Sequence, residues 1–170
     1  VVIQATGSLP GSRPYVSAED DIVIDVADVR RGSAEIPADG TIVLFDPIGG
    51  PIAVALAEEL GARAVLITQD NIADNELART GDLAPANTRL AQLGAVIERR
   101  SLLREARRGE VVVEDRYSGE RRTIACAAVI DCGFRLPSEP FEGAVQIGDA
   151  IAPRTVHEAV LEGRRAALAL

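Results

Sequence analysis

The residues best suited to binding a charged ligand form a glycine turn, Asp46-Pro47-Ile48-Gly49-Gly50-Pro51, which precedes a helical pattern. Glycines let the backbone approach a diphosphate closely, and the first N–H groups of a helix attract its charge. Gly50 and Ala53 match later positions of the dinucleotide-binding pattern G-x-G-x-x-G/A, whereas Ile48 replaces its first glycine. This context favours a dinucleotide site at Gly49 and Gly50, built on a degenerate motif.

Two departures weaken this interpretation. Asp46 stands at the end of the preceding strand, where a carboxylate repels a nearby phosphate. Thr68, rather than an acidic residue that could hold a ribose hydroxyl, follows Ile67, and Asp70 lies two residues further on. The alternative is a tight turn retained only for packing, and the residues leave both interpretations open.

A second candidate site, Gly148-Asp149, follows a later apolar run. A carboxylate at the end of a strand can accept hydrogen bonds from ligand hydroxyls. The segment Ala152-Pro153-Arg154-Thr155 and the helix after it would present N–H groups and an arginine to a diphosphate. The alternative is that Asp149 merely caps the helix.

The composition excludes several function classes. The chain has 170 residues, about one domain on a prior of ~150 residues per domain, and its mean hydropathy of +0.12 excludes disorder. With 18 Lys and Arg against 26 Asp and Glu, the net charge is −8, so we expect no nucleic-acid partner. Charged residues interrupt every apolar run before the ~20 residues that span a bilayer, so we expect no membrane partner either.

The remaining reactive side chains carry no catalytic signature, and we assign no catalytic residue. His157 is the single histidine, and no G-x-S-x-G turn accompanies it, so we expect no hydrolase triad. Cys126 and Cys132 lack C-x-x-C spacing and are expected to be buried thiols. With so few sulfur and imidazole ligands we expect no metal site. The arginines at 99, 100, 104, 107, 108, 121 and 122 are expected on the outer face of strands.

Short β-branched runs alternate with helical patterns, which predicts an α/β fold with a Rossmann-like parallel sheet. Residues 41–45, 51–60 and 64–68 form a strand–helix–strand unit of the size of a parallel crossover, and residues 95–98 predict a third parallel strand. A change of hydrophobic period then predicts a three-stranded antiparallel meander over 101–106, 110–115 and 121–125. Other expected elements are strands at 1–5, 127–131 and 145–147 and helices at 26–31, 85–93 and 155–170. Residues 17–20 predict a capping signal or the start of a turn, residues 8–16 a loop, residues 71–79 a loop or a frayed helix, and residues 136–141 a connector.

Two segments at opposite ends of the chain resemble parts of the flavoproteins that have two dinucleotide-binding domains. Ile3-Gln4-Ala5-Thr6-Gly7-Ser8-Leu9-Pro10 resembles their crossing segment, and Val145-Gln146-Ile147-Gly148-Asp149-Ala150 resembles their second flavin-contacting segment. Such proteins insert a pyridine-nucleotide-binding-like domain between these two segments. The resemblance therefore implies an NAD(P)-binding-like domain over residues 15–142, inserted in a remnant of an FAD- or ADP-binding domain made of residues 1–14 and 143–170.

Further segments are similar to the C-terminal region of the Old Yellow Enzyme-related multidomain reductases. That group includes 2,4-dienoyl-CoA reductase and the trimethylamine and histamine dehydrogenases. The similar segments are 46–51 with Ala55 and 58–60, then 81–83, 152–159 and 163–167. In this group an N-terminal barrel carries FMN and an iron–sulfur cluster, and the C-terminal portion holds FAD or ADP and, in the reductases, receives NAD(P)H.

The resemblance implies roles for particular residues of this chain. On the FAD or ADP side it places Thr6, Gly7, Gly148 and Asp149, which Arg154 and Thr155 follow, and on the nicotinamide side it places Gly49 and Gly50. We therefore expect a domain that places NAD(P)H for hydride transfer to a flavin in a larger oxidoreductase. The alternative is a non-catalytic structural domain that holds ADP or FAD and has a vestigial NAD(P) site, as in trimethylamine dehydrogenase-like proteins.

The resemblance also implies partners outside this sequence. The barrel, the cluster cysteines and the first Gly-rich strand–helix–strand unit are absent from it. We therefore expect the chain alone to be inactive and to retain no cofactor, and we expect it to pack against the barrel of the same protein. Because it opens on Val1-Val2-Ile3 rather than Met, we expect a piece of a longer protein. No signal-peptide pattern is present, so we expect a cytoplasmic location.

The inserted-domain interpretation makes one architectural prediction. Residues 1–5 and 145–147 stand far apart in the sequence but must meet in one small sheet. The helix over 155–170 should pack on that sheet. Because the other strands of such a sheet belong to an absent segment, we expect an exposed apolar face.

Overall fold

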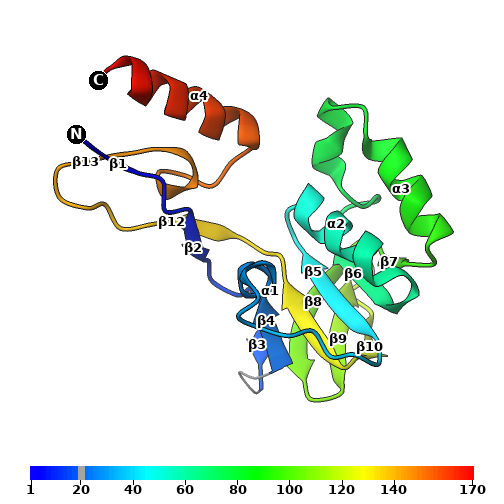
Figure 1. Cartoon of the computed structure of the whole chain (residues 1–170). Coiled ribbons are helices and arrows are strands. Elements are labelled where there is room, and N and C mark those ends of the chain that lie inside the picture. Colours follow the sequence, from blue (N-terminus) through cyan, green and yellow to red (C-terminus); the bar gives the residue numbers. More distant parts are fainter. Residues whose placement is uncertain (19–21) are drawn as a thin grey trace. The chain divides into compact units, whose positions relative to one another are not determined.

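The structure is a computed structural model that describes residues 1–18 and 22–170. Part of the predicted capping signal at 17–20 lies outside the described residues. The chain divides into two compact units, each described by itself (Figure 1). Unit 1 consists of Val1–Ser12 and Phe134–Leu170, and unit 2 is Arg13–Gly133. The sequence places the boundaries near 14/15 and 142/143, and the assignment of the two parts to two cofactors stays a prediction.

The centre of unit 2 is a five-stranded parallel sheet, in agreement with the α/β prediction. Its strands run in the order β4, β11, β5, β6, β7, and every neighbouring pair is parallel. Their bounds are Val23–Asp25, Ala128–Asp131, Ile42–Asp46, Ala64–Thr68 and Val96–Glu98. Because β11 follows the meander and inserts between β4 and β5, the chain changes direction at the β5–β11 pair. The carboxyl ends of these two strands therefore form the topological switch point, where open α/β sheets place their ligands.

Two layers cover the faces of this sheet. On one face, α1 (Val26–Arg31), α2 (Pro51–Leu60) and α3 (Leu83–Gln92) pack on Leu44 and Leu66. On the other face, Val43 and Ile67 pack against the antiparallel meander. All residues of β5 and β6 are buried, as a parallel sheet covered on both faces requires.

The predicted three-stranded meander is confirmed, and a fourth strand extends its sheet. It consists of β8 (Ser101–Arg107), β9 (Glu110–Asp115) and β10 (Arg121–Ala125), with a register shift between Leu103 and Glu105. The predicted loop at 8–16 instead contributes two short strands. β3 (Val16–Ser17) adds to the edge of β8, and β2 (Ser8–Pro10) pairs with β12 (Arg135–Pro137) in unit 1. Pairing with a distant strand overrides the turn-forming prolines and glycine there.

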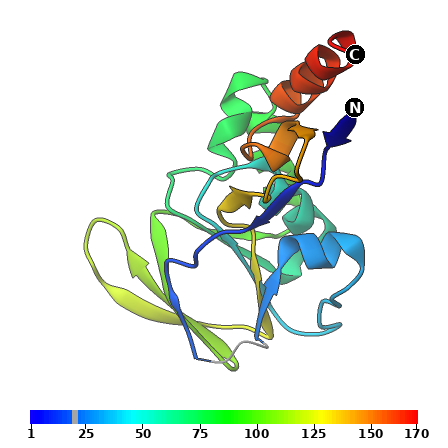
Figure 2. The same ribbon diagram turned by 90° about the vertical axis from the view of Figure 1, so that its left-hand side faces the viewer.

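Unit 1 confirms that residues 1–5 and 145–147 meet in one small sheet. β1 (Val2–Gln4) and β13 (Ala144–Gln146) form a parallel pair, and Ile147 N–H donates to the Gln4 carbonyl over 3.0 Å (Figure 2). The short 3-10 helix η4 (Gly148–Ala150) follows β13 and contacts α4 (Val156–Leu168). Apolar side chains of the strand pair remain exposed, as expected: Val2, Ile3 and Val145. The expected packing of the helix over 155–170 on this sheet is wrong in part, because no residue of α4 is buried and Val156, Val160 and Leu168 are exposed.

No helix in the described parts of the chain combines the length and apolar character needed to cross a bilayer.

The buried central strands predict a large cost for core truncation. Leu66 is fully buried between β5, β7 and the helical layer, so Leu66→Ala should lower the free energy of unfolding by about 2–5 kcal/mol. Leu93→Ala, the same truncation at a side chain that is 44% exposed, should cost about 1 kcal/mol or less. Urea unfolding followed by circular dichroism measures both. Equal losses for the two variants would contradict the placement of β6 at the centre of the core.

Candidate functional site

In the glycine turn between β5 and α2, backbone N–H groups bind the carboxylate of Asp46. Asp46 Oδ1 accepts hydrogen bonds from the N–H groups of Ile48 at 3.1 Å and Gly49 at 2.9 Å. Gly49 has φ +76°, which only glycine adopts without strain, and Gly50 is the N-cap of α2 without a side-chain hydrogen bond. Backbone N–H groups that the dinucleotide pattern would offer to a diphosphate are thus bound to Asp46.

Residues 70–79, which we call the cover, contact this turn. Glu76 N–H donates to the Gly49 carbonyl over 2.9 Å, and just before the cover Gln69 Nε2 donates to the Pro47 carbonyl over 2.6 Å. A Cβ atom added at Gly49 would lie 2.9 Å from Asp70 Oδ2. One added at Gly50 would lie 3.4 Å from Glu76 Oε2. The polar stretch expected here to be a loop or a frayed helix contains a short 3-10 helix, η3 (Asn75–Arg79), in agreement with the second alternative.

Two buried carboxylates lie beneath the cover. Asp46 is 1% exposed and Asp74 is 0% exposed. Of the described residues, none offers a hydrogen bond to Asp46 Oδ2 or to either Asp74 carboxylate oxygen. Burial raises the pKa of Asp46 to about 6, against the lowering effect of its backbone hydrogen bonds. Burial, and then the charge of Asp46, raises the pKa of Asp74 to about 7, against the lowering effect of the nearby Leu77 N–H.

A diphosphate does not fit this turn in the conformation described. Its backbone donors are occupied, and the acidic side chains of Asp46, Asp70 and Glu76 surround the two glycines. Bringing a diphosphate to this place would put like charges in contact. The assignment of Gly49 and Gly50 to a nicotinamide cofactor stays a prediction, and this geometry weighs against it.

In unit 1 two glycines follow the paired strands at the same edge. Gly7 follows β1 with φ +76°, and Gly148 follows β13 with φ +63°. An added Cβ at Gly7 meets no atom within 4 Å, so this turn faces open space. Thr6 Oγ1 lies 2.9 Å from Ser138 Oγ. The parallel register brings Thr6, Gly7 and the Gly148-Asp149 turn to one edge of the sheet. At Gly148 an added Cβ would lie 3.5 Å from the Cβ of Ala159 in α4, so only the Gly7 side of this edge is open. The assignment of these residues to an FAD or ADP site stays a prediction.

The polar residues after β13 are organised around Glu162 of α4. Gly148 N–H donates to Glu162 Oε2 over 2.7 Å, and the Arg154 guanidinium forms an ion pair with the other oxygen of that carboxylate. Asp149 Oδ1 accepts the Arg154 N–H at 3.3 Å. Thr155, whose hydroxyl donates to Glu158, is the N-cap of α4. Asp149 therefore does not cap the helix, and its second oxygen has no hydrogen-bond partner among the described residues.

Sequence reasoning missed a hydrogen bond at the switch point. The Tyr15 hydroxyl donates to Asp131 Oδ2 over 2.6 Å, and its ring packs edge-on against Phe45 with centroids 5.1 Å apart. Burial and the Asp131 carboxylate raise the pKa of Tyr15. A signal was present in the sequence, because β4, β11 and β5 all end in aspartate, at Asp25, Asp131 and Asp46. The structure assembles these three carboxylates at one edge of the sheet.

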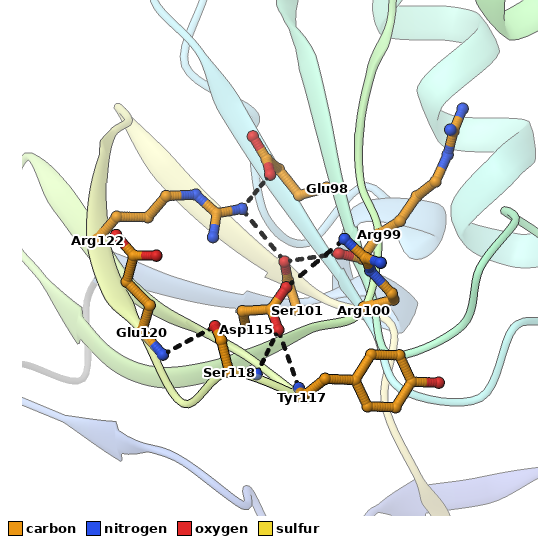
Figure 3. Close-up of polar contacts among 9 residues, drawn as sticks. All are labelled: Glu98, Arg99, Arg100, Ser101, Asp115, Tyr117, Ser118, Glu120 and Arg122. Atoms are coloured by element: carbon orange, nitrogen blue, oxygen red, sulfur yellow. Dashed lines mark hydrogen bonds and ion pairs between the residues drawn. The ribbon is translucent and has the colours of Figure 1, made fainter.

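Five arginines in or next to the meander form ion pairs with acidic residues: Arg100, Arg104, Arg107, Arg121 and Arg122. Arg122 pairs with Glu98, and Arg100 lies 3.8 Å from Asp115 and 5.8 Å from the Tyr117 ring centre (Figure 3). Arg104 and Arg121 both pair with Glu114, and Arg107 pairs with Glu105. Cys126 and Cys132 are buried and unpaired, and burial raises the pKa of both thiols. No group of three potential metal ligands occurs within residues 1–18 and 22–170.

Comparisons with known proteins relate this chain to parts of larger enzymes. No protein-family model matches the sequence, and no curated protein resembles it closely enough to match. Histamine dehydrogenase from Rhizobium sp. 4-9 matches in structure with a TM-score of 0.85 at 23% identity, over 99% of this chain and 30% of that one. The 6-hydroxypseudooxynicotine amine oxidase from Pseudomonas geniculata N1 matches with a TM-score of 0.84 at 17% identity, over 97% and 28% of the two chains. A 2-naphthoyl-CoA reductase matches with a TM-score of 0.84 at 17% identity, over 99% and 26%.

The chain shares the fold of one segment of each of these proteins. It spans about 30% or less of their length. The predicted fold class, a Rossmann-like sheet with an antiparallel meander, is confirmed by this likeness and by the sheet topology.

The two buried carboxylates make a prediction about stability and pH. Because both pKa values lie above 3.8 in the folded chain, the folded state binds more protons than the unfolded state between about pH 4 and 7. The free energy of unfolding should therefore fall as pH rises through that window. Asp46→Asn keeps an oxygen acceptor for the turn and removes the charge, so its stability should lack the Asp46 part of this fall. Between pH 4 and pH 8 its free energy of unfolding should therefore rise relative to that of wild type by up to about 2–3 kcal/mol, at ~1.36 kcal/mol per pKa unit.

Urea unfolding at several pH values measures this gain. Asp39→Asn, the same change at an exposed residue, is the matched control and should leave the pH dependence unchanged. A variant that tracks wild type at every pH would show that Asp46 is not buried as a costly charge.

Proposed function

We propose that this chain is the C-terminal nucleotide-binding-like region of a larger flavin-dependent oxidoreductase, in which unit 1 contributes to an FAD or ADP site and unit 2 is a structural domain with a closed nicotinamide-side turn. The observation that carries this proposal is the capture of the Ile48 and Gly49 N–H groups by Asp46. A nucleotide would have to displace that carboxylate. The structural likeness to segments of a dehydrogenase, an amine oxidase and a reductase supports the larger setting.

The open turn at Gly7 and the available oxygen of Asp149 support the role of unit 1. Asp149 would accept hydrogen bonds from nucleotide hydroxyls, and Gly7 would let the backbone approach the diphosphate. Arg154 is held near this edge by Glu162, where it would reduce the repulsion between that carboxylate and an incoming phosphate. A flavin bound there supplies the electron-carrying chemistry, which this chain's residues would serve by placement.

The second candidate function is placement of NAD(P)H for hydride transfer to the flavin. It is favoured by the strand–turn–helix context of the turn, with Gly50 as N-cap and Pro51 in the first turn of α2. In that case unit 2 would hold the nicotinamide ring within transfer distance of the flavin, a task of orientation rather than acid–base chemistry. The cover and the Asp46 carboxylate would both have to move away from the turn first.

Titration calorimetry with NADH separates the two candidates. We expect no binding by the unmodified chain at millimolar NADH, because Asp46 and the cover occupy the turn. Binding that Gly50→Val abolishes without unfolding the chain would instead establish the second candidate, since a β-branched side chain would stand where the diphosphate must approach.

Flavin content tests the role of unit 1. The isolated chain should purify colourless, because most of a dinucleotide site lies outside these residues in the proposed division. The longer protein, expressed with the coding sequence upstream of Val1, should retain FAD or ADP at one per chain. Asp149→Ala in that protein should weaken retention by about tenfold, roughly one lost charge-assisted hydrogen bond, whereas Asp46→Asn should not. A yellow isolated chain with defined flavin stoichiometry, or full retention in Asp149→Ala, would contradict the proposal.

A further inference from the structure

The cover is attached to the rest of unit 2 through Ala73 and Leu77, and between them it buries the carboxylate of Asp74. The Ala73 carbonyl accepts a hydrogen bond from Asn87 Nδ2 of α3 at 2.9 Å, and Ala73 is fully buried. Leu77 packs against the core beneath the helices. Between these apolar anchors stands Asp74, a fully buried carboxylate with φ +58° and with no hydrogen-bond partner in the described parts of the chain.

The charged surroundings of this carboxylate are acidic from every neighbouring element. Asp46 acts on Asp74 from the end of β5, Glu76 from η3, and Asp82 from the start of α3. The negative charge of Asp70 in turn raises the pKa of Asp46. Cys132, which follows β11, carries no charge at neutral pH because burial raises the pKa of its thiol. Within residues 1–18 and 22–170 neither carboxylate forms an ion pair, and the charges that shift their pKa values most are acidic, so burying two negative charges is costly.

We propose that the Asp46–Asp74 pair is a proton-dependent lock, which holds the cover on the glycine turn while the pair carries a proton and releases it when both carboxylates are ionised. The closed state buries both side chains, whereas opening of residues 74–79 returns Asp74 to water. Loss of the proton therefore favours the open state. Opening breaks the bond from Glu76 N–H to the Gly49 carbonyl and exposes the turn and the start of α2 to solvent.

The direction of the switch follows from the two ionisation constants of Asp74. Its pKa is about 7 in the closed state and about 3.8, the ordinary value, once the residue is exposed. The ratio of open to closed cover should therefore rise by about 30-fold between pH 5.5 and pH 8.5, with most of the rise below pH 8. This switch does not depend on the proposed function, because it requires no ligand.

Amide hydrogen exchange of the full chain, followed by NMR and corrected for the intrinsic rate at each pH, measures the opening. The probe is the Glu76 amide, which the closed cover protects through its bond to Gly49. Its corrected rate should rise by about 30-fold from pH 5.5 to 8.5 in wild type. The amide of Leu56, in the middle of α2, exchanges by global unfolding, so its corrected rate should also rise with pH but should stay well below that of Glu76 at every pH. Equal corrected rates for the two amides would assign the rise to global unfolding rather than to the cover.

Three variants assign the effect. Asp74→Asn keeps a residue that tolerates a positive φ and removes the charge, so the pH dependence should fall below about fivefold. Asp46→Asn, which keeps the acceptor for Ile48 and Gly49, should give an intermediate value because burial of Asp74 still disfavours its charge. Asp39→Asn is the matched control, because Asp39 is exposed and is not among the groups that shift the pKa of Asp74, and it should keep the wild-type response.

Two results would overturn the lock. One is a corrected Glu76 rate that does not change with pH in wild type. The other is a full wild-type response in Asp74→Asn, which would move the titrating group elsewhere. Should Asp74→Asn fail to fold, the carboxyl carbon shifts of Asp46 and Asp74 in wild type decide the question, because both must titrate well above the range of exposed aspartates.

Discussion

A parallel sheet needs cover on both faces, and unit 2 is arranged around that requirement. β5 and β6 are buried throughout, so neither face of their strands can meet water. The helices between the strands supply one cover, as right-handed crossovers do. The antiparallel meander supplies the other, and its own inner face is therefore apolar at Leu103, Val111 and Val113. Because both layers depend on the sheet, the turn at the end of β5 has a fixed position relative to the switch point.

The chemistry of this turn is decided by one side chain. In a dinucleotide site the backbone N–H groups before the helix are left for the ligand. Here the strand contributes an aspartate as its last residue, and that carboxylate takes the place in the hydrogen-bond pattern that a phosphate oxygen would take. The same side chain stands close enough to Asp74 to affect its ionisation. One residue thus links the closure of the turn with the charge beneath the cover.

The sequence predicted the elements whose signals are local. The apolar run 41–45, the proline at position 51 and the glycine at 61 define β5 and α2, and alternating periodicity defined the meander. The pairing of residues 1–5 with 145–147 came from the resemblance and is confirmed. The short strands β2 and β3 were missed because their partners lie far away in sequence, and their own residues favour turns. Burial of Asp74 was also beyond the sequence, since a polar stretch of acidic residues ordinarily faces solvent.

The bond between Gly11 and Phe134 has a consequence for how this chain can be divided. Gly11 N–H donates to the Phe134 carbonyl over 2.8 Å, and a Cβ atom at Gly11 would lie 2.4 Å from that oxygen. The two strands of polypeptide that enter and leave residues 13–133 are therefore adjacent within unit 1. A segment whose ends start so close together can be excised and its flanks joined by a few residues, or exchanged for another module with neighbouring termini. Recombination on either side of residues 13–133 would likewise leave the strand pairs of unit 1, β1 with β13 and β2 with β12, intact.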